Sequence, residues 1–217
     1  MNFQLQTGTK DCFPTCFGNA MFHFGVAMTP ALQKRLALFK DGTESCTIYA
    51  PQERLENYER SIHKFAAEWH WALGHTNDTG RYQPQQWATD LIKAGIEIEA
   101  RNGPVEQQKL IIDSLKNGTI AICEIWIPSD EIPDSESKHF VLIIKLAGGK
   151  LFMHDPLPGD RSVLFDSDNV AYAENECGSN LRIDSNYFFS NEIAYMKPKP
   201  NPFQQDYGYK FLLISKK

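Results

Sequence analysis

The first clear pattern along the chain is an apolar stripe at helical spacing that begins at Phe13 and reaches Phe24. Asp11 can cap this helix, and Pro14 falls in its first turn, where the missing N–H of proline costs little. The pattern therefore predicts a helix that begins near Phe13 and carries Cys12 at its N-terminal end.

Farther along the chain, the hydrophobic period changes from helical to alternating. Amphipathic patterns predict helices over residues 51–73 and 84–94. Alternating or continuously apolar stretches predict strands at 95–100 and 119–127, with a helix over 104–118 between them. This part of the chain is expected to follow a strand, helix, strand order.

The second half of the chain is rich in strand patterns. The stretches KHFVLIIKL and LFMHDP, joined by AGGK, predict a β-hairpin over residues 138–156. Shorter strands joined by long loops are expected at 162–165, 187–196 and 207–215. Because helices gather toward the N-terminus and strands toward the C-terminus, the predicted fold class is α+β.

Composition limits the functional classes. A chain of 217 residues can bury a real core, and we expect one domain with an insertion. The net charge of -5 and the scattered Lys and Arg argue against a nucleic acid partner. No stretch is apolar for long enough to cross a membrane, and the first residues lack the pattern of a secretory signal, so a cytoplasmic location is expected. The five widely spaced cysteines do not suggest a disulfide framework.

Cys12 and Cys16 lie four residues apart and allow three interpretations. A structural zinc site needs a second ligand pair, and neither His70 with His75 nor His23 supplies a recognised one. A disulfide is disfavoured because Cβ atoms four residues apart on a helix are separated by about 5–6 Å, whereas a bridge needs roughly 3.5–4.5 Å. In the third interpretation Cys12 is a nucleophile, since the N–H groups at a helix N-terminus stabilise a thiolate, and Cys16 belongs to the core.

Two polar residues of the predicted hairpin can complete such a site. His139 opens one strand beside a polar loop, and Asp155 ends the next strand. The hairpin brings the start of the first strand next to the end of the second, so His139 and Asp155 are expected to be neighbours. His154 is the alternative partner, because alternation along a strand lets only one of two adjacent residues face the site.

A nucleophile that attacks a carbonyl also needs hydrogen-bond donors for the oxyanion that forms. Gln6 lies six residues before Cys12 and can supply its side-chain amide, with the Cys12 N–H as the second donor. Gln4 is the competing residue, and spacing favours Gln6.

The order of these residues resembles a known family. The pattern Q-x5-C, with DCFPTC opening a helix, followed by KHFVLI and HDP, is similar to the papain-like cysteine peptidases that remove double-glycine leaders from bacteriocin precursors. The resemblance covers residues 6–26 and 118–156 and implies a papain-like fold, with the nucleophile helix packed on an antiparallel sheet. Matched residue by residue, it implies an oxyanion donor, a nucleophile, a general base and an orienting acid, which are Gln6, Cys12, His139 and Asp155.

The chain also departs from that family. Phe13 stands where the family usually has Gly after the nucleophile. The separation between Cys12 and His139 is longer than usual, which predicts a helical insertion around residues 27–83 within a single domain of residues 1–217. Residues 157–217 show no resemblance and are expected to form a divergent, β-rich part.

The combined interpretation is a cysteine peptidase or amide hydrolase that acts on a peptide or protein through a thioester acyl-enzyme and needs no cofactor or metal. It leaves the oligomeric state open. The same acyl-enzyme could serve a transferase or a deamidase, including one delivered to another cell as an effector or toxin. Because Phe13 could fill the acyl pocket, a catalytically silent peptide-binding module is the alternative from another class.

Overall fold

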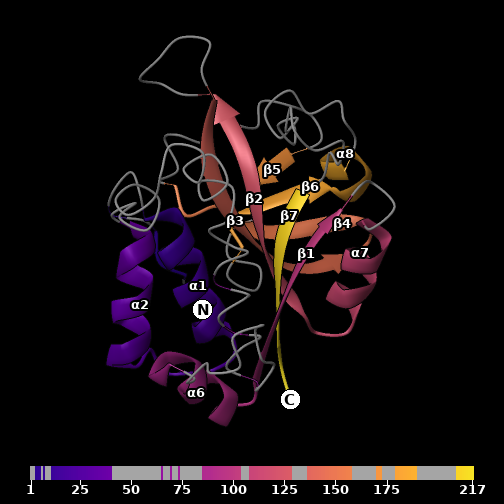
Figure 1. The fold of residues 1–217 in the computed structure, drawn as a ribbon. Coiled ribbons are helices and arrows are strands. Elements are labelled where there is room, and N and C mark those ends of the chain that lie inside the picture. Colours follow the sequence, from indigo (N-terminus) through magenta and orange to yellow (C-terminus); the bar gives the residue numbers. More distant parts are fainter. Residues whose placement is uncertain are drawn as a thin grey trace.

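The structure is a computed structural model, and it describes residues 3–5, 7, 11–40, 65, 69, 73, 85–103, 108–128, 136–157, 170–172, 179–189 and 209–217. Within these residues, helices lie against an antiparallel sheet, which makes the fold α+β (Figure 1). The helices described are α1 (Cys12–His23), α2 (Pro30–Lys40), α6 (Gln86–Lys93), α7 (Gln108–Lys116) and α8 (Ser185–Phe189).

The strands of the described residues form a seven-stranded sheet in the order β1-β7-β2-β3-β4-β6-β5, and every neighbouring pair is antiparallel. The strand following α7, β2, is separated from β1 by the C-terminal strand β7, so β1 and β2 run parallel without being hydrogen-bonded to each other. The bounds are β1 (Ile96–Gly103), β2 (Ile120–Pro128), β3 (Glu136–Ala147), β4 (Lys150–His154), β5 (Val170–Tyr172), β6 (Leu181–Asp184) and β7 (Tyr209–Lys216).

Helices cover both faces of this sheet. Helices α1, α2 and α6 lie on one side, and α7 and α8 lie on the other (Figure 1). In β3, Phe140 and Leu142 join the core under α1, whereas Val141 and Ile143 join the core under α7. Successive side chains of a strand point to opposite faces of the sheet. The continuous apolar run of β3 is therefore typical of a strand whose two faces are both covered by helices.

The hairpin predicted at residues 138–156 is confirmed as β3 and β4. Gly148 and Gly149 form its turn with φ of 57° and 74°, the left-handed values that a two-residue turn of this kind demands and that glycine adopts without strain. The pairing shifts register between Ile143 and Lys145, so a bulge lies between the turn and the paired residues Leu142 and His154.

The predicted helix at Phe13, those at 84–94 and 104–118, and the strands at 95–100, 119–127 and 207–215 are also confirmed within small shifts of their ends. Of the helix expected over 51–73, the described Phe65 and Trp69 are helical and buried in the core, and the remainder lies outside the described residues except for Leu73, which is exposed in a turn.

Two expectations for the last third are wrong. Residues 187–189, the start of the strand predicted over 187–196, are helical in α8, because the Asp184 carboxylate accepts hydrogen bonds from the N–H groups of Asn186 and Tyr187 and caps a helical turn there. Residues 190–196 lie outside the described residues. Between the strands expected at 162–165 and 187–196, where the sequence predicts a long loop, the structure has two further short strands, β5 and β6. The strand expected at 162–165 lies outside the described residues.

Much of the insertion expected around residues 27–83 also lies outside the described residues, and α2 is the helix described within it. No helix in the described ranges combines the length and the apolar character that a membrane span requires.

Candidate active site

Cys12 is the first residue of α1, as the sequence predicts. The helix begins with the bond from Thr15 N–H to Asp11 C=O at 2.9 Å, and the Asp11 carboxylate accepts a hydrogen bond from Thr7 Oγ1 at 2.9 Å. Asp11 therefore ties the start of the helix to the segment that precedes it. Its side chain makes no capping hydrogen bond to α1, so the cap expected at Asp11 is wrong. The Cys12 side chain lies at the edge of the core, with 8% of the residue exposed.

Phe13, the residue after Cys12, anchors the start of α1 in the core. Its ring is almost fully buried and packs edge-on against Phe140 of β3 and Phe65, with ring centroids 5.2 and 5.7 Å away. Phe13 is thus part of the core between α1 and the sheet. The alternative in which this ring fills the space for an acyl group stays a prediction.

Cys16 lies one turn deeper and is fully buried, which confirms its expected place in the core. Its thiol donates a hydrogen bond to the Phe140 carbonyl at 3.4 Å. Burial raises the pKa of the Cys16 thiol, and the negative charges of Cys12 and Asp155 add to this effect. Cys16 therefore stays neutral. Cys123 of β2 is also buried as expected, and burial raises its pKa as well.

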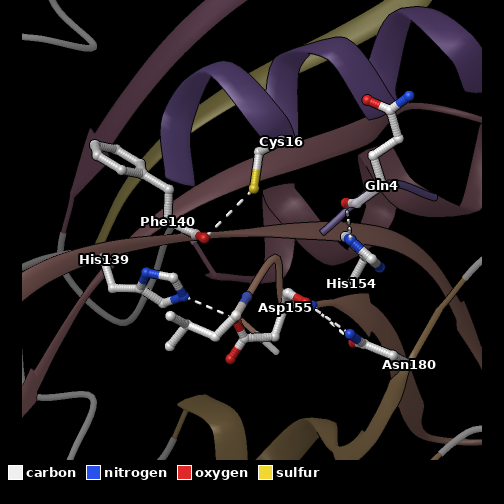
Figure 2. A network of polar contacts seen from close by, with 8 residues as sticks. Gln4, Cys16, His139, Phe140, His154, Asp155 and Asn180 are labelled. Atoms are coloured by element: carbon white, nitrogen blue, oxygen red, sulfur yellow. Dashed lines mark hydrogen bonds and ion pairs between the residues drawn. The ribbon is translucent and has the colours of Figure 1, made fainter. Parts of the chain in front are cut away.

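The structure brings His139 and Asp155 together, as the predicted hairpin implies. His139 lies near the start of β3, opposite Ile125 of β2, and Asp155 directly follows β4. The His139 Nε2 and Asp155 Oδ1 atoms are 2.8 Å apart, and the two residues are 3% and 4% exposed (Figure 2). The same carboxylate oxygen accepts a hydrogen bond from the Leu157 N–H at 2.9 Å, which fixes its orientation.

Cys12 interacts with the same imidazole ring. Burial alone would lower the pKa of His139, but hydrogen bonds with Asp155 and Cys12, and the charges of both, outweigh burial and raise it from 6.5 to about 9. Nε2 of the ring is the atom bonded to Asp155. Both Asp155 and Cys12 thus favour the protonated form of the His139 ring.

His154, the alternative partner, is engaged elsewhere. Its Nε2 donates a hydrogen bond to the Gln4 carbonyl at 2.9 Å, and its ring lies edge-on to Phe3 with centroids 5.3 Å apart (Figure 2). The alternation along β4 thus turns His154 toward the N-terminal segment, while Asp155 contacts His139.

The predicted oxyanion residue, Gln6, lies outside the described residues. Its neighbour Gln4 is exposed at its side chain, and its backbone is held from two sides. Asn19 of α1 bonds to both the N–H and the C=O of Gln4, each at 2.9 Å, and His154 bonds to the same C=O. The segment leading to Gln6 is therefore attached to α1 and to the strand that precedes Asp155.

Asn180 contacts the candidate site through Asp155, and it was not identified from the sequence. Its side-chain Oδ1 accepts from the Asp155 N–H at 2.8 Å, and its Nδ2 donates to the Asp155 C=O at 2.6 Å (Figure 2). One asparagine in a stretch expected to be loop carries no local signal of this contact. The position of an Asn directly before the short strand β6 is a weak signal that its side chain could bond to a neighbouring strand.

A cavity of about 620 Å³ opens along α1. Its lining starts at Gln4 and at Asp11, the residue before Cys12, and continues over Thr15 and Phe22 to Met28 beyond the helix. Cys12, His139 and Asp155 are not among the residues that line this cavity.

Among the described residues, no group of three or more His, Cys, Asp or Glu side chains is arranged to hold a metal ion. His70 and His75, considered with Cys12 and Cys16 for zinc, lie outside these residues. Comparison with models of known protein families and with curated proteins found no match for this chain.

Proposed function

We propose that this protein is a cysteine peptidase or related amide hydrolase of papain-like fold that acts on a peptide or protein through Cys12, His139 and Asp155. The observation that carries the proposal is the ring of His139, which is bonded to Asp155 at Nε2 and interacts with Cys12, at the N-terminus of a helix. Nucleophile, base and orienting acid in contact form the arrangement that activates a thiol for attack on a carbonyl.

In the proposed reaction, the Cys12 thiolate attacks the carbonyl carbon of the substrate amide. The C–N bond breaks, a thioester forms, and His139 gives its proton to the departing amine. His139 then takes a proton from water as the water attacks the thioester, which releases the carboxylic acid and restores the starting state. Asp155 holds the ring during both steps, and backbone N–H groups at the start of α1 stabilise the oxyanion, with Gln6 as the expected second donor.

Two features support hydrolysis over a silent binding module. Phe13 packs against Phe65 and Phe140 in the core, which favours a site in which its ring leaves room for an acyl group. His139 and Asp155 are almost fully buried and bonded to each other, and burying such a pair without a use for it is costly. The cavity that begins at Gln4 and Asp11, the residue before Cys12, offers room for part of a substrate next to the start of α1.

The test is incubation of the protein with a mixed peptide library, followed by mass spectrometry of the products. We expect shortened peptides from the wild type and none from Cys12→Ala or His139→Ala. The matched control is His23→Ala, which removes a histidine at the far end of α1 and should retain activity. A gain of about one dalton or a new cross-link, dependent on Cys12, would replace hydrolysis with deamidation or transfer. Full activity of Cys12→Ala would refute the assignment.

A further inference from the structure

Asp155 lies at a point where the regular pairing of the sheet ends. Strand β4 stops at His154, and Pro156, which has no N–H, follows Asp155. The Asp155 carboxylate must nevertheless keep a fixed direction, because one of its oxygens bonds to both His139 Nε2 and Leu157 N–H. Because the Asp side chain is short, the position of the Asp155 backbone largely sets the direction of its carboxylate. This backbone therefore needs a hydrogen-bond partner beyond the end of β4.

Asn180 supplies that support from the adjoining chain segment. Strand β6 pairs with β4 as far as Leu181 opposite Met153, and the Asn180 N–H continues the pairing to the Met153 C=O at 3.0 Å. The Asn180 side-chain amide then bonds to the N–H and C=O of Asp155 at 2.8 and 2.6 Å. An amide side chain has the same donor and acceptor as a peptide group, so it replaces the strand partner that Asp155 would otherwise lack.

We propose that Asn180 is a positioning residue of the active site, which holds the backbone of Asp155 so that its carboxylate stays on His139 Nε2. The inference rests on the proposed function for its catalytic meaning, but its geometry does not depend on that function. It also gives a role to residue 180, which lies in the part of the chain that shows no resemblance to the leader peptidases.

The chemistry of the side chain explains why asparagine is suited to this position. Aspartate would place a carboxylate oxygen against the Asp155 carbonyl, where Nδ2 now donates. Leucine has nearly the same shape but leaves both the N–H and the C=O of Asp155 without this partner. Buried polar groups that lose their partners shift toward water, so either substitution should release the Asp155 backbone.

The test follows the titration of the His139 ring by NMR in protein labelled at histidine. The described titratable groups that interact with this ring are Cys12 from α1 and Asp155 after β4. When Asn180→Leu lets the carboxylate move away, the ring stays buried but loses an opposite charge, an effect worth roughly 1–3 pH units. We expect the titration midpoint of His139 to fall by about one pH unit or more.

The matched control is Ile183→Val in the same strand, β6. Ile183 is buried and pairs with Leu151, so this variant loosens β6 without removing a bond to Asp155. We expect its His139 midpoint to equal that of the wild type. If Asn180→Leu does not fold, Asn180→Ala, which removes the same two bonds and adds no charge, gives the same readout.

An unchanged midpoint in a folded Asn180 variant overturns the inference, even if the protein proves to be an active peptidase. A lowered midpoint together with an unreactive Cys12 in the wild type leaves the positioning role intact and refutes the proposed function. A midpoint lowered equally in Ile183→Val would assign the effect to general loosening of β6, which also overturns the inference.

Discussion

Replacing Asp155 by asparagine should remove a pH dependence of stability that the structure predicts for the wild type. The pKa of His139 is raised from 6.5 to about 9 against the effect of burial, by Asp155 and by Cys12. A folded-state pKa above the unfolded value means that the protonated ring stabilises the folded state. This stabilisation is fully present below about pH 6.5 and is lost as the pH rises through about 9.

The magnitude follows from the size of the rise. One pKa unit corresponds to about 1.4 kcal/mol, so the wild type should lose about 3 kcal/mol of unfolding free energy between pH 6.5 and 9. His139 is 3% exposed, and screening by solvent therefore reduces this value little. The hydrogen bond to the Asp155 carboxylate makes the largest contribution to the raised pKa of His139. In Asp155→Asn this partner is uncharged, and we expect the variant to lose less than about half as much unfolding free energy over this pH range as the wild type.

The assay is urea denaturation of wild type and Asp155→Asn at several pH values between 6 and 9. Other titrations in this window, such as that of His23, whose pKa is lowered by burial, occur in both proteins and cancel in the difference. Asp184→Asn is the matched control, because Asp184 caps α8 at the surface and its pKa is lowered by the hydrogen bonds it accepts, so it titrates well below this window. Equal pH slopes in wild type and Asp155→Asn would refute the reasoning.

Other predictions concern packing, proton transfer and the N-terminal segment. Phe13→Ala should reduce the free energy of unfolding by about 3–5 kcal/mol in urea titrations, because it empties the space between Phe65 and Phe140; a loss below 1 kcal/mol would place that ring outside the core. Peptidase activity should decline as the pH rises through about 9, since His139 must carry a proton for the leaving amine, and a rate that stays flat to pH 10 would exclude this role. Asn19→Leu should cost about 1–3 kcal/mol in the same titrations, because two hydrogen bonds to the Gln4 backbone are lost.

The local part of the site could be predicted from the sequence because local patterns determine it. The apolar stripe that starts at Phe13 indicates where α1 begins, and therefore where Cys12 lies, although the side chain of Asp11 does not cap the helix. Two glycines between two apolar runs fix the hairpin, and the hairpin brings His139 to Asp155.

The rest of the arrangement depends on contacts between distant segments. The apolar run in β7 indicates a strand buried on both faces, but it does not say that this strand lies between β1 and β2. Asn180 bonds to the backbone of Asp155, and backbone groups are the same at every position, so no pairing of residue types reveals the contact. The helical turn at α8 arises because the Asp184 carboxylate caps it, against the strand preference of Tyr and Phe in that stretch.

The central claim is that Cys12 is an activated nucleophile. The most direct measurement is brief treatment with limiting iodoacetamide at about pH 6, where an ordinary thiol with a pKa near 8.5 is almost fully protonated, followed by peptide mapping. We predict fast, selective labelling of Cys12 that is lost in His139→Ala and retained in His23→Ala. Labelling of Cys12 no faster than that of Cys46 or Cys177 would contradict the account.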